Sequence, residues 1–239
     1  MMKKIIYSLV SFVLVSCSLG PIEAQVINNV SVVEFNKLIN SDEGIVLDVR
    51  TIGEVNEGHI EDATNIDFYA SDFTEKLALI RKDVPIYVYC ASGGRSSKTV
   101  TKMKDLGFKK VYNLLGGFGA WKSEGLKVVV TKGEILKKQK AMSVIEFSDI
   151  IESNDVVLVD FSTQWCVPCK KMKPVIEEIK KENKDVKIVF IDADANKELV
   201  RKFKVRGVPV FIVFKDGNEE FRHVGMIDKK ELINKIKLE

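Results

Sequence analysis

Two cysteines three residues apart constrain this chain more than any other feature of its sequence. Cys166 and Cys169 follow the apolar run 156–161, and a helical pattern continues over residues 170–181. The start of a helix carries about half a positive charge, which favours a thiolate over a thiol. The second sulfur lies within reach to close a disulfide after the first has attacked. Pro168 between them suits an early helical position, where its missing N–H is no loss.

Three interpretations compete for this cysteine pair. Half of a zinc site would need further ligands, and no second cysteine pair or histidine pair lies nearby in the sequence. A structural disulfide across a two-residue gap would close a trivial loop and remove little entropy from the unfolded chain. A reversible redox pair fits the strand-to-helix context best, and we expect neither a metal nor an organic cofactor.

Residues 143–239 resemble the thioredoxin family in motifs that occur in the family's order. The matching pieces are Trp165-Cys166-Val167-Pro168-Cys169, the strand 211–214, the turn Asp216-Gly217, and Gly225. The resemblance implies a buried catalytic carboxylate at Asp160, a cis-proline at Pro209, and partner binding by Trp165 and by the backbone of Val208. The sequence departs from the family at Val167 and Ser162, and at Phe190, where many members carry a lysine paired to the carboxylate.

Residues 1–17 have the pattern of an export signal. Two lysines precede the apolar stretch 5–15, which is too short to span a bilayer comfortably. An uncleaved anchor is the alternative. The stretch ends in Leu14-Val15-Ser16-Cys17, which resembles the bacterial lipobox and implies that Cys17 is lipidated after cleavage. We therefore predict, in preference to free secretion, a lipid-anchored protein on the periplasmic or outer face of a membrane of the bacterial envelope.

The rest of the chain alternates between short apolar runs and helical patterns, which predicts an α/β fold with two domains. We expect a tether at 18–26, a first domain with a parallel sheet at 26–126, a lysine-rich linker at 127–142, and a second domain at 143–239. In the first domain the predicted strands are 45–49, 85–89 and 111–113. One predicted helix begins after Ser31, which forms a capping-box pattern with Glu34. Further helices are predicted over 73–81, 96–106 and 117–123.

A further cysteine, Cys90, ends the predicted strand 85–89. The residues that follow it and open a helix are Ala91, Ser92, Gly93, Gly94, Arg95 and Ser96. Small side chains there let several N–H groups point at one spot and bind an anion. We expect a lowered pKa and a strong nucleophile at Cys90, with Arg95 forking onto sulfonate or sulfite oxygens. The alternative is a buried cysteine followed by an ordinary glycine turn.

Residues 26–126 resemble the rhodanese family of sulfurtransferases. The matching pieces are Leu47-Asp48-Val49-Arg50, Glu54, Gly58-His59-Ile60, Ala63-Thr64-Asn65-Ile66, the loop from Cys90 to Arg95, and 115–121. The resemblance implies that Cys90 takes a sulfane sulfur from a donor such as thiosulfate and holds it as a persulfide, with Asp48, Arg50 and the loop around the substrate. Related phosphatases have an active-site loop one residue longer than the loop from Cys90 to Arg95, which argues against phosphatase activity. We expect His59 to be structural and Asp62, where glycine is common, to affect only a turn.

These features predict an envelope sulfurtransferase and thiol–disulfide oxidoreductase. The dithiol Cys166/Cys169 would reduce the Cys90 persulfide or protein disulfides, and would itself need an upstream reductant. In an alternative hypothesis, the second domain acts alone as a protein-disulfide reductase and the first is a binding or sensing module. A third and weaker hypothesis is a cytosolic enzyme with an unusual N-terminus. The net charge of +3 does not indicate nucleic-acid binding. Each hypothesis requires Cys90 and Cys166 to be ionisable and accessible to solvent.

Overall fold

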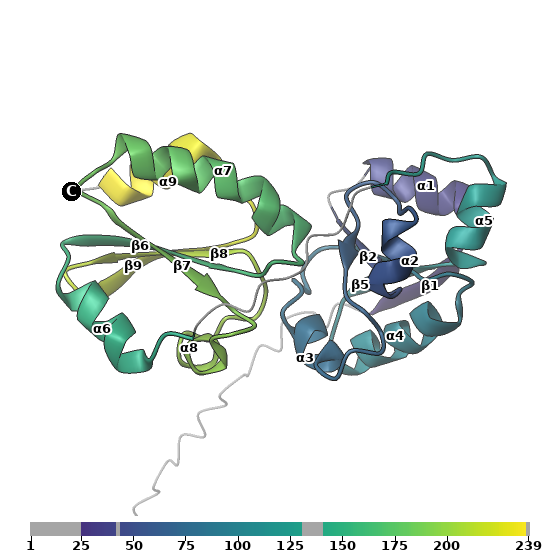
Figure 1. Cartoon of the computed structure of the whole chain (residues 1–239), viewed down its shortest axis with the longest axis horizontal. Helices are drawn as coiled ribbons and strands as arrows, with labels where there is room; N and C mark the ends of the chain where they lie inside the picture. The colour runs from purple at the N-terminus through teal and green to yellow at the C-terminus, as the bar shows by residue number, and fades with distance from the viewer. Residues whose placement is uncertain (1–24, 42–43, 131–140, 238–239) are drawn as a thin grey trace, which may run out of the picture.

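The computed structural model describes residues 25–41, 44–130 and 141–237, which form two layered α/β domains side by side (Figure 1). The predicted signal with Cys17, the tether up to residue 24 and most of the linker lie outside the described residues. Among the described residues, no helix combines the length and the apolar character needed to cross a membrane.

The N-terminal domain is built on a five-stranded sheet in the order β1-β5-β4-β2-β3. All its pairings are parallel, as predicted. Its elements in chain order are β1 (Val26–Val30), α1 (Val32–Ser41), β2 (Ile45–Asp48), α2 (Ile52–Asn56), β3 (Thr64–Asn65), α3 (Phe73–Ala78), β4 (Ile86–Tyr89), α4 (Gly94–Asp105), β5 (Lys110–Leu114) and α5 (Gly117–Ser123).

Strand β4 lies at the centre of this sheet and is buried along its whole length. Successive side chains on a strand point to opposite faces. Val88 and Cys90 belong to the apolar cluster under α3 and α4, whereas Tyr87 and Tyr89 belong to the one under α1 and α5. The sulfur of Cys90 therefore leaves the sheet on the side of α3 and α4.

The C-terminal domain has a four-stranded sheet in the order β7-β6-β8-β9, with α7 and α9 on one face and α6 and α8 on the other (Figure 1). Strand β6 pairs with β7 in parallel and with β8 antiparallel, and β9 is antiparallel to β8. Its elements are α6 (Val144–Glu152), β6 (Val156–Ser162), α7 (Val167–Glu182), β7 (Lys187–Asp192), α8 (Lys197–Lys202), β8 (Val210–Lys215), β9 (Asn218–Val224) and α9 (Lys229–Lys237).

The structure corrects three predictions about the N-terminal domain. Residue 26 is not tether but begins strand β1, which pairs with β5. The helix predicted over 73–81 ends at Ala78. Helix α2, five residues long, and strand β3, two residues long, were not predicted because such short elements carry little periodicity. Helix α2 is instead specified by a capping box between Thr51 and Glu54.

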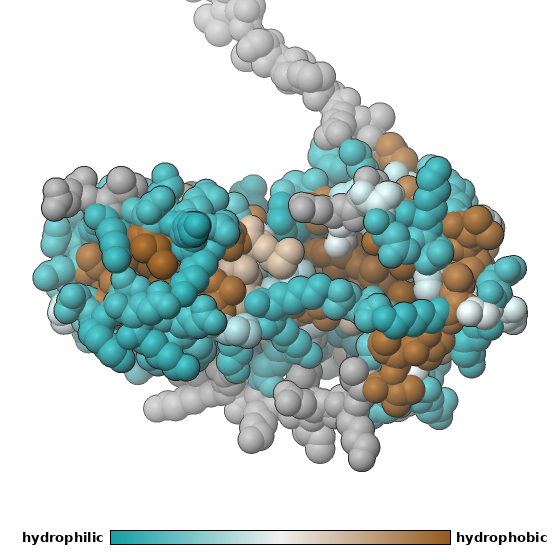
Figure 2. Space-filling model, turned by 90° about the horizontal axis from the view of Figure 1, so that it is seen from above, coloured by the Kyte–Doolittle hydropathy of each residue, from teal (hydrophilic) through white to brown (hydrophobic). Residues whose placement is uncertain are grey.

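The surface is mostly polar, as expected for a chain in which 30% of the residues are charged. Seen from above, polar side chains cover most of both domains, and apolar ones show mainly over the N-terminal domain (Figure 2). Exposed large apolar residues such as Val33, Ile52 and Leu115 are spaced along different elements. Single exposed apolar residues are ordinary on a folded protein, so they do not mark a site.

Candidate functional site

The loop after β4 places hydrogen-bond donors around the sulfur of Cys90. The N–H of Gly93 donates to Cys90 Sγ at 3.1 Å, and the hydroxyl of Ser96 lies 3.5 Å from the same sulfur. Gly93 has φ 102°, a left-handed conformation that glycine adopts without steric cost, and it turns the chain into α4. The predicted nest of donors is therefore present.

The Cys90 thiol is shifted toward its thiolate form. Burial raises its pKa, but the hydroxyl of Ser96 and the N–H groups of Ser92, Gly93 and Ser96 stabilise the anion, and the net effect is a lowered pKa. A larger thiolate fraction at neutral pH makes this sulfur the better nucleophile. The structure thus agrees with the electrostatic part of the prediction for Cys90.

The start of helix α5 holds the Cys90 loop in place. The N–H groups of Phe118 and Gly119 donate to the carbonyls of Cys90 and Ala91, at 2.7 and 2.9 Å. Gly117 has φ 59°, and a Cβ there would overlap the Cys90 carbonyl oxygen. The glycine motif before Trp121 is therefore explained by close backbone contact with the reactive loop.

Arg95 is engaged by a neighbouring carboxylate. Its two terminal nitrogens donate to the carboxylate oxygens of Glu54 at 2.6 and 2.7 Å, and its guanidinium lies over the ring of Tyr69. This ion pair holds the pKa of Glu54 down at about 2 and raises the pKa of Arg95. The fork that was predicted to bind sulfite oxygens is occupied by Glu54 in this structure.

Asp48 and Arg50 lie in the interior rather than at the mouth of the loop. Both side chains are buried, and the guanidinium donates to the Asp48 carboxylate at 2.6–3.0 Å while it stacks on Phe118 at 4.0 Å. Phe118 in turn donates its N–H to Cys90. This geometry suits support of the loop from below, whereas the prediction was direct contact with substrate.

The cysteine pair lies at the start of α7. Cys166 is the N-cap and Cys169 is the third helical residue, and the two form a disulfide. The N–H of Cys169 donates to Cys166 Sγ at 3.2 Å, which repeats the relation between Gly93 and Cys90 three residues apart. Each N-terminal sulfur therefore faces the free N–H groups of a helix start.

Asp160 lies on β6, on the face that α7 covers. Leu158, two residues earlier on the same strand, packs in the apolar cluster with Ile176 and Ile179 of α7. Residues two apart on a strand point to the same face, so Asp160 also points toward α7. Burial raises its pKa to about 7, opposed only in part by the charge of Lys173. One of its carboxylate oxygens has no hydrogen-bond partner among the described residues. A carboxyl group in this state accepts and releases a proton near neutral pH.

Trp165 and Pro209 complete the surroundings of the disulfide. The indole N–H of Trp165 donates to Asp194 at 2.6 Å. The peptide bond between Val208 and Pro209 is cis, as the resemblance implied. The N–H of Val208 donates at 3.0 Å to the carbonyl of Leu79 in the N-terminal domain. The backbone that was predicted to receive a partner chain is thus already paired with a segment of its own protein.

The predicted accessibility of the two nucleophiles is wrong for this arrangement of the chain. Cys90 is 1% exposed and Cys166 is 3% exposed. Cys90 lies in the apolar cluster with residues of α3 and α4, and its own loop closes over the sulfur. Cys166 belongs to an apolar cluster that also contains Leu79 and Ile80 of the other domain. Neither sulfur can meet a partner until its cover moves.

Comparison with known proteins identifies both domains. A thioredoxin family model matches residues 138–238, and a rhodanese-like domain model matches residues 31–124. The thioredoxin of Mycobacterium tuberculosis is 42% identical over 90 residues, which are 37% of this chain and 78% of that protein. The chain belongs to the thioredoxin family. Its thioredoxin domain forms the C-terminal half, and a rhodanese-like domain precedes it.

Further relatives are similar to one domain or the other. The thioredoxin of Chlamydia muridarum is 43% identical over 90 residues, covering 38% of this chain and 87% of that one. A solved rhodanese-related protein from Thermoplasma volcanium is 31% identical and covers 44% of this chain and 99% of its own, with a TM-score of 0.40. A mutant thioredoxin from Halobacterium salinarum is 35% identical over 41% of this chain and 88% of its own, with a TM-score of 0.38.

The two domains hold their reactive sulfurs apart. Thr64 of β3 pairs with Leu47 of β2, and Leu47 pairs with Val88 of β4. Cys90 follows Val88 by two residues, so it lies two strands away from Thr64. Strand spacing and rise then separate the Cα atoms of Thr64 and Cys90 by about 12 Å. The thioredoxin domain reaches Thr64 through Val167, whose N–H donates to its hydroxyl at 3.3 Å. Because both sulfurs are also buried, attack of Cys166 on a persulfide at Cys90 requires the two domains to move from this arrangement.

Sequence reasoning missed the residues through which the domains meet. Asp62, expected to affect only a turn, forms an ion pair with Lys171 of the thioredoxin domain at 2.6 Å. The Thr64 hydroxyl and the Leu79 carbonyl accept backbone N–H groups of the thioredoxin domain. The departure at Asp62 was a signal in the sequence, but its meaning depends on the position of the other domain. Leu79 has the same pattern as any core residue, so nothing singled it out.

Proposed function

We propose that this protein couples sulfur transfer at Cys90 to dithiol–disulfide exchange at Cys166 and Cys169. One observation carries the proposal: both domains present a cysteine whose sulfur accepts the N–H three residues on, at the start of a helix. The same local geometry stabilises a thiolate in each case. Two activated sulfurs of this kind in one chain suit successive steps of sulfur and electron transfer.

In the first step the Cys90 thiolate attacks the sulfane sulfur of thiosulfate. A sulfur–sulfur bond forms on Cys90, the bond within thiosulfate breaks, and sulfite leaves with the bonding electron pair. The N–H groups of the loop stabilise the anionic persulfide that results, because they already point at the sulfur. Arg95 would have to exchange part of its contact with Glu54 to bind the sulfonate oxygens.

In the second step the reduced dithiol removes that sulfur. Once the domains have moved from the arrangement seen here and both sulfurs are uncovered, the Cys166 thiolate takes the outer sulfur and releases Cys90 as a thiolate. Cys169 then attacks Cys166, the disulfide forms, and hydrosulfide leaves, so the two electrons come from the dithiol. Asp160, with its pKa of about 7, accepts the proton of Cys169, and that proton ends on the leaving sulfur as hydrosulfide. Protein disulfides are exchanged by the same pair, and an upstream reductant restores the dithiol.

We further propose that these reactions take place in the bacterial envelope, with the protein held to a membrane by lipid on Cys17. The support is the signal-like sequence of residues 1–17, which lies outside the described residues. In an oxidising compartment the dithiol depends on a supply of electrons, which is why the proposal includes an upstream reductant.

The test is a mass measurement of the reduced protein after treatment with thiosulfate. We expect one added sulfur atom, located on the peptide that contains Cys90, and its loss as hydrosulfide when the thioredoxin pair is kept reduced. Cys90→Ser should gain no sulfur, whereas Cys166→Ser should gain it and retain it. A Cys90→Ser protein that consumes thiosulfate at the full rate would refute the sulfurtransferase step.

A second function is favoured by the separation of the sulfurs. In this alternative the thioredoxin domain exchanges protein disulfides independently, and the rhodanese-like domain serves as a binding or sensing module. The rate of persulfide loss from Cys90 distinguishes the two. A rate independent of protein concentration indicates transfer within one molecule, and a rate proportional to concentration indicates independent domains.

A further inference from the structure

The redox centre of the thioredoxin domain is covered by one stretch of the rhodanese-like domain. Leu79 and Ile80 are 5% and 2% exposed, and they share an apolar cluster with Trp165, Cys166 and Val208. These residues come from both domains, so the cluster continues across the contact. Thiol–disulfide exchange needs direct access of one sulfur to another, which this cover prevents.

Two backbone N–H groups of the thioredoxin domain donate to the rhodanese-like domain, one to the covering stretch and one to Thr64. The N–H of Val208, directly before cis-Pro209, donates to the Leu79 carbonyl at 3.0 Å. The N–H of Val167, the first residue of α7, donates to Thr64 Oγ1 at 3.3 Å. Both donors would otherwise be free to receive an incoming chain, because neither has a partner within its own helix or strand.

Arg81 extends this contact over two glycines of the thioredoxin domain. A Cβ on Gly207 would lie 3.0 Å from Arg81 Cγ and 3.1 Å from its Cα, and a Cβ on Gly225 would overlap the guanidinium. Asp83 holds the guanidinium by an ion pair at 2.6 Å. The seat on the thioredoxin domain therefore accepts two apolar residues followed by an arginine, presented by the turn that ends α3.

We propose that residues 79–81 are a built-in occupant of the partner-binding groove of the thioredoxin domain, and that external protein partners compete with them. The inference rests on the proposed disulfide exchange and adds its regulation: the docked chain is a closed state in which Cys166 does not react. Since both domains belong to one chain, their effective concentration is on the order of mM and favours this closed state. Partners with an apolar–apolar–basic segment fit the groove best.

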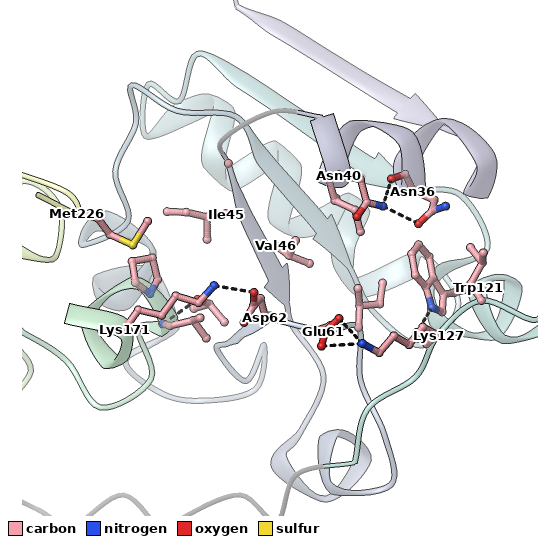
Figure 3. Close-up of a pocket in the computed structure, with 17 residues that line it drawn as sticks. Asn36, Asn40, Ile45, Val46, Glu61, Asp62, Trp121, Lys127, Lys171 and Met226 are labelled. Carbon is pink, nitrogen blue, oxygen red and sulfur yellow. Dashed lines mark hydrogen bonds and ion pairs between the residues drawn. The ribbon is translucent and has the colours of Figure 1, made fainter. Parts of the chain in front are cut away.

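The closed state is reversible because its rim is weak and incompletely packed. Lys171 pairs with Asp62 at 2.6 Å and Lys197 with Glu75 at 3.1 Å, and all four side chains are at least one-third exposed. Exposed ion pairs of this kind change an equilibrium by about fivefold at most. Cavities of about 470 and 840 Å³ lie beside the contact, and in the smaller one Lys171 and Met226 face Ile45 and Asp62 across the space (Figure 3).

Charge exchange at the Glu75–Lys197 pair tests the proposal, because both residues lie outside the two reactive loops. The variants are Glu75→Lys, the swap Glu75→Lys with Lys197→Glu, and the control Glu219→Lys. The control makes the same charge change at an ion pair inside the thioredoxin domain. Each full-length protein is reduced and treated briefly with iodoacetamide, and alkylation of Cys166 is measured by peptide mass with Cys90 as internal reference. Insulin disulfide reduction is measured in parallel.

Glu75→Lys removes the attraction to Lys197 and adds a like-charge repulsion of similar size. We therefore expect it to raise the alkylation rate of Cys166 by about five- to tenfold at low salt, with Cys90 unchanged, and insulin reduction to rise in the same order. The swap should return to within about twofold of the parent, and Glu219→Lys should match it. Equal Cys166 rates in the parent and Glu75→Lys, or a swap that stays fast, would overturn the closed state. If the proposed dithiol–disulfide exchange itself is wrong, no variant should reduce insulin faster than the parent, whatever its alkylation rate. This outcome differs from failure of the closed state, which equal alkylation rates would show.

Discussion

The buried carboxyl group of Asp160 makes the stability of the thioredoxin domain depend on pH. Burial raises its pKa from 3.8 to about 7. At about 1.4 kcal/mol for each pH unit, ionising this group in the folded state costs about 4 kcal/mol. The folded chain binds the proton more tightly than the unfolded chain between these two values. Stability is therefore highest at acid pH and is lost as the pH rises through 7.

Replacing Asp160 with asparagine removes this titration while keeping the shape of the side chain. Between pH 5 and pH 8 the parent should lose about 2–3 kcal/mol of unfolding free energy at this site, and Asp160→Asn should not. Any fixed cost of the new amide is the same at both pH values, so the pH dependence is the quantity to compare. Urea unfolding of the oxidised protein, followed by the fluorescence of Trp165 in a Trp121→Phe background, reports on this domain because the chain has two tryptophans.

Asp185→Asn provides the matched control. Asp185 is exposed, between α7 and β7, so its replacement should change the unfolding free energy by less than about 0.5 kcal/mol at either pH. If Asp160→Asn and its parent keep the same difference in unfolding free energy at pH 5 and pH 8, then burial does not raise the pKa of Asp160. The proposed role of this group as proton acceptor for Cys169 would then also fail.

Three changes in the rhodanese-like domain test the Cys90 loop. Ser96→Ala removes a hydroxyl that stabilises the thiolate, so the midpoint of the pH profile of Cys90 alkylation should rise by about one pH unit. Glu54→Gln removes a carboxylate whose pKa is lowered to about 2. The parent's unfolding free energy should fall as the pH drops from 4.5 toward 2, and that of Glu54→Gln should lack this fall. The freed Arg95 should also lower the KM for thiosulfate. Gly117→Ala puts a Cβ against the Cys90 carbonyl, so thiosulfate consumption should fall by about tenfold or more, measured against Gly125→Ala, where no atom lies within contact distance.

The elements that carry the two cysteine motifs could be predicted from the sequence because local signals specify them. An apolar strand followed by small residues and then a helical pattern fixes where Cys90 lies, and the observed β4 and α4 differ from the predicted ranges by one or two residues. The cap at Ser31, which accepts the N–H of Glu34 at 3.2 Å, and the cis bond before Pro209 also agree with prediction. These features depend on nearby residues or on a motif, so a single sequence contains them.

The environment of a charged side chain was harder to predict. Arg95 has the position expected for an anion ligand, yet its fork is bound to Glu54, far away in the sequence. Asp48 and Arg50 satisfy each other in the interior. A motif gives the residue type at a position but not the partner that compensates its charge, and a buried group stays charged only where it has such a partner. The same limit applies to Asp62, whose partner Lys171 lies in the other domain.

Leu79 shows why the closed state was invisible in the sequence. The spacing of Phe73, Leu77 and Ile80 fits a helix that would continue to residue 81, and in a helix the Leu79 carbonyl would point along the axis. The helix ends at Ala78 instead, and the N–H groups of Leu79 and Ile80 turn back to Lys76 and Leu77 at 3.1 and 3.0 Å. That early end leaves the Leu79 carbonyl free for the N–H of Val208 and directs two apolar side chains into the contact. Periodicity shows that these side chains are buried, but only the folded pair of domains shows what buries them.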